Sequence, residues 1–304
     1  MYFIGVTTAK SSINRLFPLW AEALRLGDCA LRGIDFELRD DPARYRAAVE
    51  FIRRDPLSLG ALVTTHKMDL CAACRDLFDE LDPLSSVLGE VSSIYKRNGR
   101  LFARALDQVT SGLALAAFLP EGHWANTRAE AAILGAGGAA IGLTWHLAQG
   151  AHGANRPTKI HVADRNPTRL DHLRGLHAAW NSGVPLELHL APETRMADAI
   201  VNRLPPGSLV VNATGLGKDA PGSPLSDEAL FPESGFAWEF NYRGNLVFLD
   251  QARRQQSARH LTVEDGWNYF LHGWTRVIAD VFAVAIPARG PDFLALGRLA
   301  AGAR

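Results

Sequence analysis

The sequence predicts an α/β protein of two domains: an N-terminal α/β domain, and a second domain built on a doubly wound parallel sheet. Apolar strand-like segments alternate with helix-like segments over residues 1 to about 110. A glycine-rich turn then joins an apolar strand to an apolar helix over residues 131–150, and the strand-like "KIHVAD", residues 159–164, follows it. The chain of 304 residues is long enough for two domains of ordinary size.

In the first domain, "MYFIGV" (1–6) and "GALVTT" (60–65) are predicted to be buried parallel strands, because both are short and apolar. The segments 13–26, 42–54 and 68–81 have apolar residues at helical spacing and are predicted to be helices. Cys71 and Cys74 lie three residues apart in the last of these. A second ligand pair at zinc spacing is missing, so we interpret both thiols as small buried side chains and predict no metal site; the alternative is a redox or metal role.

The composition narrows the classes of partner. The chain carries 32 basic and 32 acidic side chains, and 47% of its residues are hydrophobic, which is typical of a globular protein. Balanced charge offers no basic surface for a nucleic acid backbone. The first residues lack the pattern of a secretory signal, and no segment reaches membrane-spanning length. We therefore expect a cytoplasmic protein that binds a small neutral or anionic metabolite, with no nucleic acid or membrane partner.

The segment "AAILGAGGAAIGLTWHLAQG", residues 131–150, has the strand, tight turn and helix of a dinucleotide site. Gly135 permits the turn, Gly137 lets the backbone approach a pyrophosphate, and Ala140 allows the helix to pack closely on the strand. The helix then offers its free amides to the phosphates. The alternative is a plain turn between two buried elements. The residues predicted to contact the cofactor here are Gly135, Ala136, Gly137, Gly138 and Ala139.

Two later segments strengthen this interpretation. "KIHVAD" ends in Asp164, placed to bind the adenosine ribose hydroxyls in a Rossmann domain. "SLVVNATGLG", residues 208–217, is apolar and then abruptly small and polar, which suits a strand that opens onto a ligand crevice. There Asn212, Thr214, Gly215 and Gly217 are candidates to lie against the nicotinamide ribose, although a turn after a buried strand would look the same. Together the segments predict a nicotinamide dinucleotide site.

With an α/β domain in front of this site, the chain resembles the shikimate dehydrogenase family, which includes the quinate/shikimate dehydrogenases. "ALVTTHK" (61–67) resembles the family's Asn-Val-Thr-x-Pro-x-Lys block, and "GEVSSI" (89–94) its Gly-Ala-Val-Asn-Thr block. "ARALD" (103–107) resembles the block that ends Asn-Thr-Asp, "ADRNPTR" (163–169) the cofactor block, and "VNATGLG" (211–217) the Val-Asn-Ala-Thr-x-x-Gly block. The blocks follow in order over nearly the whole chain.

The resemblance implies a catalytic pair, Lys67 and Asp107, in a cleft that faces the nicotinamide. Hydride transfer from a secondary alcohol must be coupled to movement of the hydroxyl proton, and an ammonium beside a carboxylate can relay that proton. Without the resemblance, each residue would be read as surface charge. We expect a substrate domain at 1–110, joined by C-terminal helices at about 266–304, and a dinucleotide domain at 111–265.

The substrate-facing positions depart from the family pattern. Its asparagine, threonine and proline in the lysine block correspond to Ala61, Val63 and Thr65. Ser11 is kept, but Ile13 stands at the second serine and Gly273 at the glutamine of the C-terminal block. Ala105 and Leu106 replace the asparagine and threonine before the aspartate, and Ser92 replaces another asparagine. The candidate substrate contacts are therefore Ser11, Thr64, Thr65, Ser92, Tyr269 and His272, although a core tyrosine and a solvent-facing histidine are equally good readings of the last two.

We predict an NAD(P)-dependent oxidoreductase acting on CH–OH groups of a cyclic or short-chain hydroxy acid or polyol other than shikimate, because unmatched polar partners are costly. The alternatives are a true shikimate or quinate dehydrogenase, and a non-catalytic dinucleotide-binding regulator. Asp164 slightly favours NAD over NADP, while Arg165 and Arg169 resemble phosphate-clamping positions. Gly266 is a further candidate at the cofactor. A monomer or a homodimer is expected.

Overall fold

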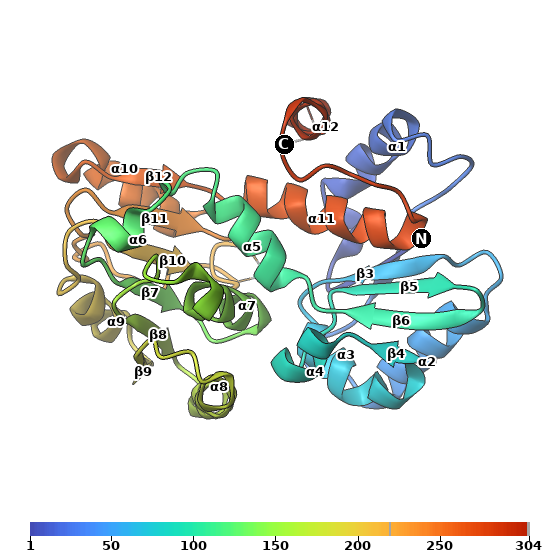
Figure 1. Cartoon of the computed structure of the whole chain (residues 1–304), viewed down its shortest axis with the longest axis horizontal. Coiled ribbons are helices and arrows are strands. Elements are labelled where there is room, and N and C mark those ends of the chain that lie inside the picture. The colour runs from blue at the N-terminus through green and yellow to red at the C-terminus, as the bar shows by residue number, and fades with distance from the viewer. Residues whose placement is uncertain (219, 303–304) are drawn as a thin grey trace. The chain divides into compact units, whose positions relative to one another are not determined.

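The computed structural model describes residues 1–218 and 220–302. The chain divides into two compact units, one made of Met1–Leu106 with Leu271–Arg304 and the other of Asp107–Phe270 (Figure 1). The C-terminal segment expected at about 266–304 thus belongs mostly to the first unit, and its last two residues lie outside the described part of the chain.

The first unit is built on a six-stranded mixed sheet in the order β2-β1-β3-β5-β6-β4. Its strands are β1 (Tyr2–Gly5), β2 (Arg32–Asp35), β3 (Gly60–Val63), β4 (Glu80–Leu81), β5 (Ser93–Arg97) and β6 (Arg100–Arg104). The predicted strands at 1–6 and 60–65 are present, and β1 pairs with β3 in parallel. Beyond β3 the sheet is mixed: β5 is antiparallel to β3 and forms an antiparallel hairpin with β6, and β4 pairs with β6 in parallel.

The N-terminal part of this unit has the helices α1 (Ile13–Ala23), α2 (Pro42–Arg54), α3 (Lys67–Cys74) and α4 (Pro83–Leu88), with 3-10 turns at Thr8–Lys10 and Arg75–Leu77. Asp41 caps α2 by accepting a hydrogen bond from the amide of Ala43, and Pro42 fills the first helical position. The helix predicted over 68–81 was wrong beyond Cys74. The amides of Asp79 and Asp82 bond instead to carbonyls of β6, which pulls this segment into the sheet.

The core of the first unit packs α2 and α3 against the sheet. Its fully buried members include Tyr45, Val49, Ile52, Ala61, Val63, Leu70, Cys71, Cys74 and Ile94. The two thiols therefore have the buried position expected from the sequence. Burial raises the pKa of Cys74 to about 12, so this thiol stays protonated and unreactive.

The C-terminal helices are α11 (Trp267–Phe282) and α12 (Pro291–Ala301), and from Leu271 onward they belong to the first unit. The Arg104 guanidinium lies 2.8 Å from the Asp280 carboxylate of α11. The indole of Trp20 on α1 donates to the carbonyl of Leu296 on α12 at 3.1 Å. These contacts attach both helices to the N-terminal sheet and helices.

The second unit is a doubly wound sheet of six parallel strands, in the order β12-β11-β10-β7-β8-β9. The strands are β7 (Ala131–Leu134), β8 (Ile160–Asp164), β9 (Leu186–Leu190), β10 (Leu209–Asn212), β11 (Phe236–Glu239) and β12 (Thr262–Glu264). The helices are α5 (Asp107–Leu115), α6 (His123–Asn126), α7 (Gly138–Ala148), α8 (Pro167–Trp180), α9 (Thr194–Val201) and α10 (Val247–Arg259), with a 3-10 turn at Gly150–His152. One face of the sheet packs on α9 and α10. The predicted fold class is confirmed.

Among the helices of the described residues, none combines the length and the apolar character needed to cross a membrane.

Candidate active site

The glycine turn lies between β7 and α7, at the carboxyl end of the central strands of the second unit. Gly135 has φ +108°, and a Cβ there would stand 2.8 Å from the carbonyl oxygen of Ala213, so only glycine fits. Gly137 is the N-cap of α7, and its Cβ position meets no atom within 4 Å. The helix therefore begins with an uncovered backbone, as phosphate binding requires.

Asp164, at the end of β8, is hydrogen-bonded to this turn. One carboxylate oxygen accepts a hydrogen bond from the amide of Ala136 at 2.7 Å, and the other accepts from the amide of Asn166 at 2.8 Å. Asn166 in turn caps α8. The acid thus joins the turn to the start of the next helix, while Arg165 and Arg169 are exposed. Each carboxylate oxygen has a second lone pair with which to accept a ribose hydroxyl.

Asn212 closes β10 and is completely buried. Its amide nitrogen donates to Glu239 at 2.6 Å, and its oxygen accepts from the backbone amide and the hydroxyl of Thr214, at 3.0 and 2.6 Å. Both ends of the side chain are used inside the unit. The structure therefore assigns Asn212 to holding the Thr214 to Gly217 loop in place, whereas the exposed Gly215 belongs to that loop's open surface.

Glu239 and Asn241 complete this arrangement, and the sequence interpretation missed both. Glu239, at the end of β11, accepts hydrogen bonds from Asn212 and from the amide and side chain of Asn241. Asn241 also donates to the carbonyls of Thr214 and Leu216. The sequence did contain a signal for Glu239, because an acid within the apolar run "FAWEF" requires buried partners. Gly266 belongs to the same region, since a Cβ there would lie 2.1 Å from the carbonyl oxygen of Phe240.

Burial raises the pKa of Glu239 from 4.5 to about 7, although Asn241, Asn212 and Lys218 all lower it. Because the folded state holds this proton more tightly than the unfolded state, the stabilising contribution is lost as pH rises from about 4.5 through 7. We expect this group to lower the free energy of unfolding by about 3 kcal/mol between pH 5 and pH 8. Urea unfolding across this range should show a flatter dependence for Glu239→Gln than for the unmodified protein.

That comparison also separates the contribution of Glu239 to the pH dependence of stability from the contribution of the buried histidines. Burial lowers the pKa of His146 and of His272 to about 4, so their contribution has the opposite sign and is lost as pH falls below 6.5. Both proteins in the comparison, the unmodified one and Glu239→Gln, keep these histidines. Equal pH slopes for the two proteins would contradict the role assigned to Glu239.

In the first unit, the segment "VTTHK" turns sharply between β3 and α3. Thr65 has φ +58°, a conformation that costs a β-branched residue about 1–3 kcal/mol and that proline cannot adopt. His66 is buried, with Nδ1 3.0 Å from the hydroxyl of Tyr45. Lys67 follows as the first residue of α3 and is half-buried. The loop before the lysine therefore differs from the proline-containing loop of the family that this chain resembles.

Two of the remaining polar candidates of this unit occupy internal positions. Ser11 and Ser92 are buried, and the Ser92 hydroxyl accepts from the amide of Leu106 at 3.3 Å. The same hydroxyl lies 3.5 Å from Glu90, a completely buried acid that the sequence interpretation did not single out. Ala61 and Val63 face the apolar core, whereas Thr64 is half-buried and Thr65 exposed.

Asp107 begins α5 in the second unit and is buried. Gly142 of α7 makes room for it, because a Cβ at Gly142 would stand 2.8 Å from the Cβ of Asp107. α5 and α7 are thus packed in close contact at this residue. Lys67 belongs to the first unit and Asp107 to the second, so their pairing across a cleft stays a prediction.

Two candidates in α11 have environments that argue against substrate contact. Tyr269 packs on Trp238 and Phe240 in an aromatic cluster of the second unit. His272 is only 3% exposed and stacks on Phe293 of α12 with 4.4 Å between ring centroids, so the solvent-facing reading of this histidine was wrong. The apolar spacing of α11 places it on a covered face of the helix. Gly273, the next residue, has nothing within 4 Å of its Cβ position.

Comparisons with known proteins give a consistent result. No family model matches the chain. The chain is 30% identical over 178 residues to shikimate dehydrogenase (NADP(+)) of Lactococcus lactis subsp. cremoris (strain MG1363), a match covering 58% of this chain and 59% of that protein. It is 26% identical over 238 residues to shikimate dehydrogenase (NADP(+)) of Streptococcus gordonii (strain Challis), covering 74% of this chain and 77% of the relative.

Solved structures match over nearly the full length. Shikimate 5-dehydrogenase from Thermus thermophilus, in complex with shikimate, superposes with a TM-score of 0.71 at 23% identity, covering 99% of this chain and 97% of the other. Quinate dehydrogenase from Corynebacterium glutamicum, in complex with NAD, gives 0.71 at 19% identity and covers 99% and 98%. These neighbours all point to the shikimate and quinate dehydrogenase family. The family resemblance read from the sequence is confirmed, and at these identities the solved structures show that the fold is shared.

The shared fold covers both units of this chain, and the second unit has the doubly wound parallel sheet of a Rossmann domain. The match to the first relative spans 59% of that protein's length. The glycine turn and the acid at the end of β8 are candidates for a dinucleotide site, whereas the loop before Lys67 and the buried positions of β3 do not follow the family blocks.

Proposed function

We propose that this protein is an NAD(P)-dependent oxidoreductase that transfers a hydride between the nicotinamide and a CH–OH group of a cyclic hydroxy acid or polyol other than shikimate. The observation that carries the proposal is the turn from Gly135 to Gly138, with its open helix start and its bond to Asp164. That arrangement leaves backbone amides for a pyrophosphate and a carboxylate for a ribose. Lys67 and Asp107 are proposed to hold the alcohol oxygen and move its proton.

The side chains at the substrate-facing positions of the first unit differ from those of the family, and this difference favours a substrate other than shikimate. Ala61 and Val63 are buried in apolar packing where the family places asparagine and threonine, and Gly273 supplies no side chain where the family places glutamine. A substrate with several hydroxyl groups would leave some of them unmatched, at about 1–3 kcal/mol each. A ligand with one less polar face fits this composition better.

A second candidate is a true shikimate or quinate dehydrogenase, favoured by the names of the curated relatives and by the quinate dehydrogenase among the structures. A panel of cyclic hydroxy acids and polyols, including shikimate and quinate, assayed with both cofactors by absorbance of the reduced nicotinamide, separates the two. If no compound in the panel is oxidised while the cofactor still binds, a non-catalytic dinucleotide-binding role replaces both.

The cofactor itself is proposed to be NAD in preference to NADP. The Asp164 carboxylate repels a 2′-phosphate that carries about two negative charges, while the exposed Arg165 and Arg169 partly offset that repulsion. We expect the unmodified protein to bind NAD somewhat more tightly and Asp164→Asn to shift the preference toward NADP by about tenfold. Titration of both cofactors into both proteins measures this. Tighter binding of NADP by the unmodified protein would show that the arginines outweigh the carboxylate.

A further inference from the structure

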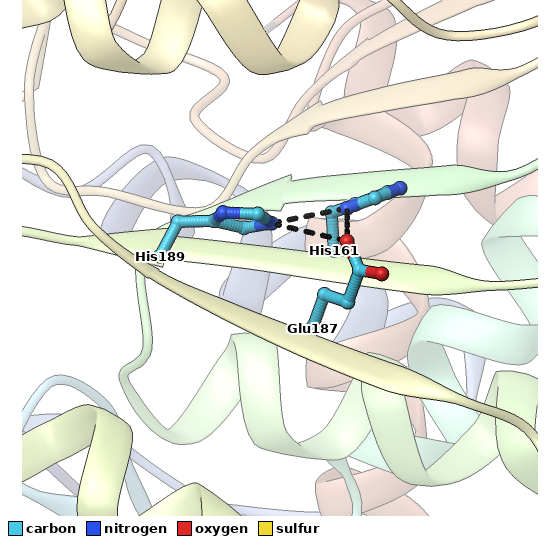
Figure 2. Close-up of side chains that lie close together, drawn as sticks. All are labelled: His161, Glu187 and His189. Carbon is cyan, nitrogen blue, oxygen red and sulfur yellow. Dashed lines mark hydrogen bonds and ion pairs between the residues drawn. The ribbon is translucent and has the colours of Figure 1, made fainter.

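Three potential metal ligands converge on the outer strands of the parallel sheet. His161 lies on β8, and Glu187 and His189 lie on β9, the edge strand. The parallel register pairs His161 with Glu187 and Ala163 with His189, so the alternation of side chains puts all three on one face. Figure 2 shows the ring of His189 directed at His161, with the Glu187 carboxylate beside both.

The spacing of their ligand atoms suits a metal ion. Nδ1 of His161 lies 3.0 Å from Nε2 of His189 and 3.4 Å from an oxygen of Glu187, and the last two atoms are 4.0 Å apart. A triangle with these sides encloses a point about 2.1 Å from every corner, which equals the usual Zn–N and Zn–O bond length. One ion can therefore reach all three atoms without movement of the backbone.

The surrounding groups leave these same atoms available. Nε2 of His161 lies 2.9 Å from a carboxylate oxygen of Glu130, and donation of its proton there leaves the lone pair on Nδ1, inside the triangle. A carboxylate behind a ligating histidine is the usual outer contact of a zinc site. Lys159 bonds to the other oxygen of Glu187 at 2.6 Å, so the oxygen within the triangle remains for the ion.

Access and charge are also compatible with binding. The side chains of Glu187 and His189 are 47% and 28% exposed, so an ion can enter from solvent. The positive charges of Lys159 and Arg203 act on His189 and oppose a cation. We therefore expect weaker binding than at a closed structural zinc site.

We propose that His161, Glu187 and His189 bind a divalent transition metal ion of the zinc type, with water completing the coordination. The ion would join β8 to the edge strand β9. His161 stands three residues before Asp164 along β8, so the ion would lie about 10 Å from the acid and outside hydride transfer. Its role is to hold the edge of the sheet, and it does not depend on the function proposed above.

The test is zinc binding by tag-free, chelator-treated full-length protein, measured by titration calorimetry and by competition with a zinc indicator. We expect one equivalent per chain, with Mg²⁺ failing to compete because imidazole ligands suit zinc and not a hard cation. His189→Ala and Glu187→Gln change partly exposed side chains and should each weaken binding at least tenfold, while Glu130→Gln should weaken it about tenfold. His172→Ala, an exposed histidine of α8, is the matched control and should bind normally.

Thermal unfolding supplies an independent measurement. At a hundredfold excess over its dissociation constant, zinc should raise the Tm of the unmodified protein by about 5 °C and leave that of His189→Ala unchanged. Any one of three outcomes would overturn the proposal. These are the absence of saturable zinc binding, equal zinc affinity in His189→Ala and the unmodified protein, and competition by Mg²⁺ at similar concentration.

Discussion

Replacing Lys67 by alanine, or Asp107 by asparagine, is expected to lower turnover of the best substrate in the panel by about 100-fold or more. This is the usual loss when a group that moves a proton in the transition state is removed. Lys67 begins α3 after a strained turn, and Asp107 is packed against Gly142 at the start of α5. Both residues thus stand at the first position of a helix.

Steady-state kinetics with cofactor titration test this expectation. Cofactor affinity should be unchanged in both variants, because the glycine turn and Asp164 are untouched. Asp69→Asn removes an exposed charge from the first turn of the same helix as Lys67 and should keep near-normal turnover. Near-normal turnover in Lys67→Ala would remove the lysine from the proposed mechanism, whatever the fate of Asp107.

Shikimate is expected to be a poor substrate, with a kcat/KM at least about 100-fold below that of the best compound in the panel. Two lost polar partners, at about 1–3 kcal/mol each, are enough for a difference of this size. Restoring the family residues should recover part of it. Gly273→Gln restores one of them at a position on α11 where nothing lies within 4 Å of the Cβ, so this variant should raise kcat/KM for shikimate about tenfold.

A matched control is available for this substitution. Gly175→Gln places the same side chain on α8 of the other unit, also where nothing lies within 4 Å of the Cβ position, and should leave kcat/KM for shikimate unchanged. If the unmodified protein uses shikimate best and at ordinary efficiency, the proposal of a rebuilt substrate site is wrong and the shikimate dehydrogenase alternative stands.

The elements that the sequence predicted well are those with local signals. β7, the glycine turn and α7 were predicted because glycines and apolar periodicity fix a strand, turn and helix without reference to distant residues. The overrun of the helix beyond Cys74 shows the limit of such signals, since hydrogen bonds to β6, about twenty residues away in sequence, decided where that helix ends. The strand β9 was not predicted, because "LELHL" is short, partly charged and lies at a sheet edge.

The sequence by itself determined the α/β class, the glycine turn, Asp164 at the end of β8 and the family resemblance, because each depends on residues close together in the chain. Only the tertiary structure showed that Asn212 serves Glu239 and the Thr214 loop, that His272 is covered by Phe293, and that Ala61 and Val63 belong to an apolar core. It also brought His161 within 3.0 Å of His189, 28 residues later. Burial and partner choice depend on which segments pack together, and periodicity along one segment does not contain that information.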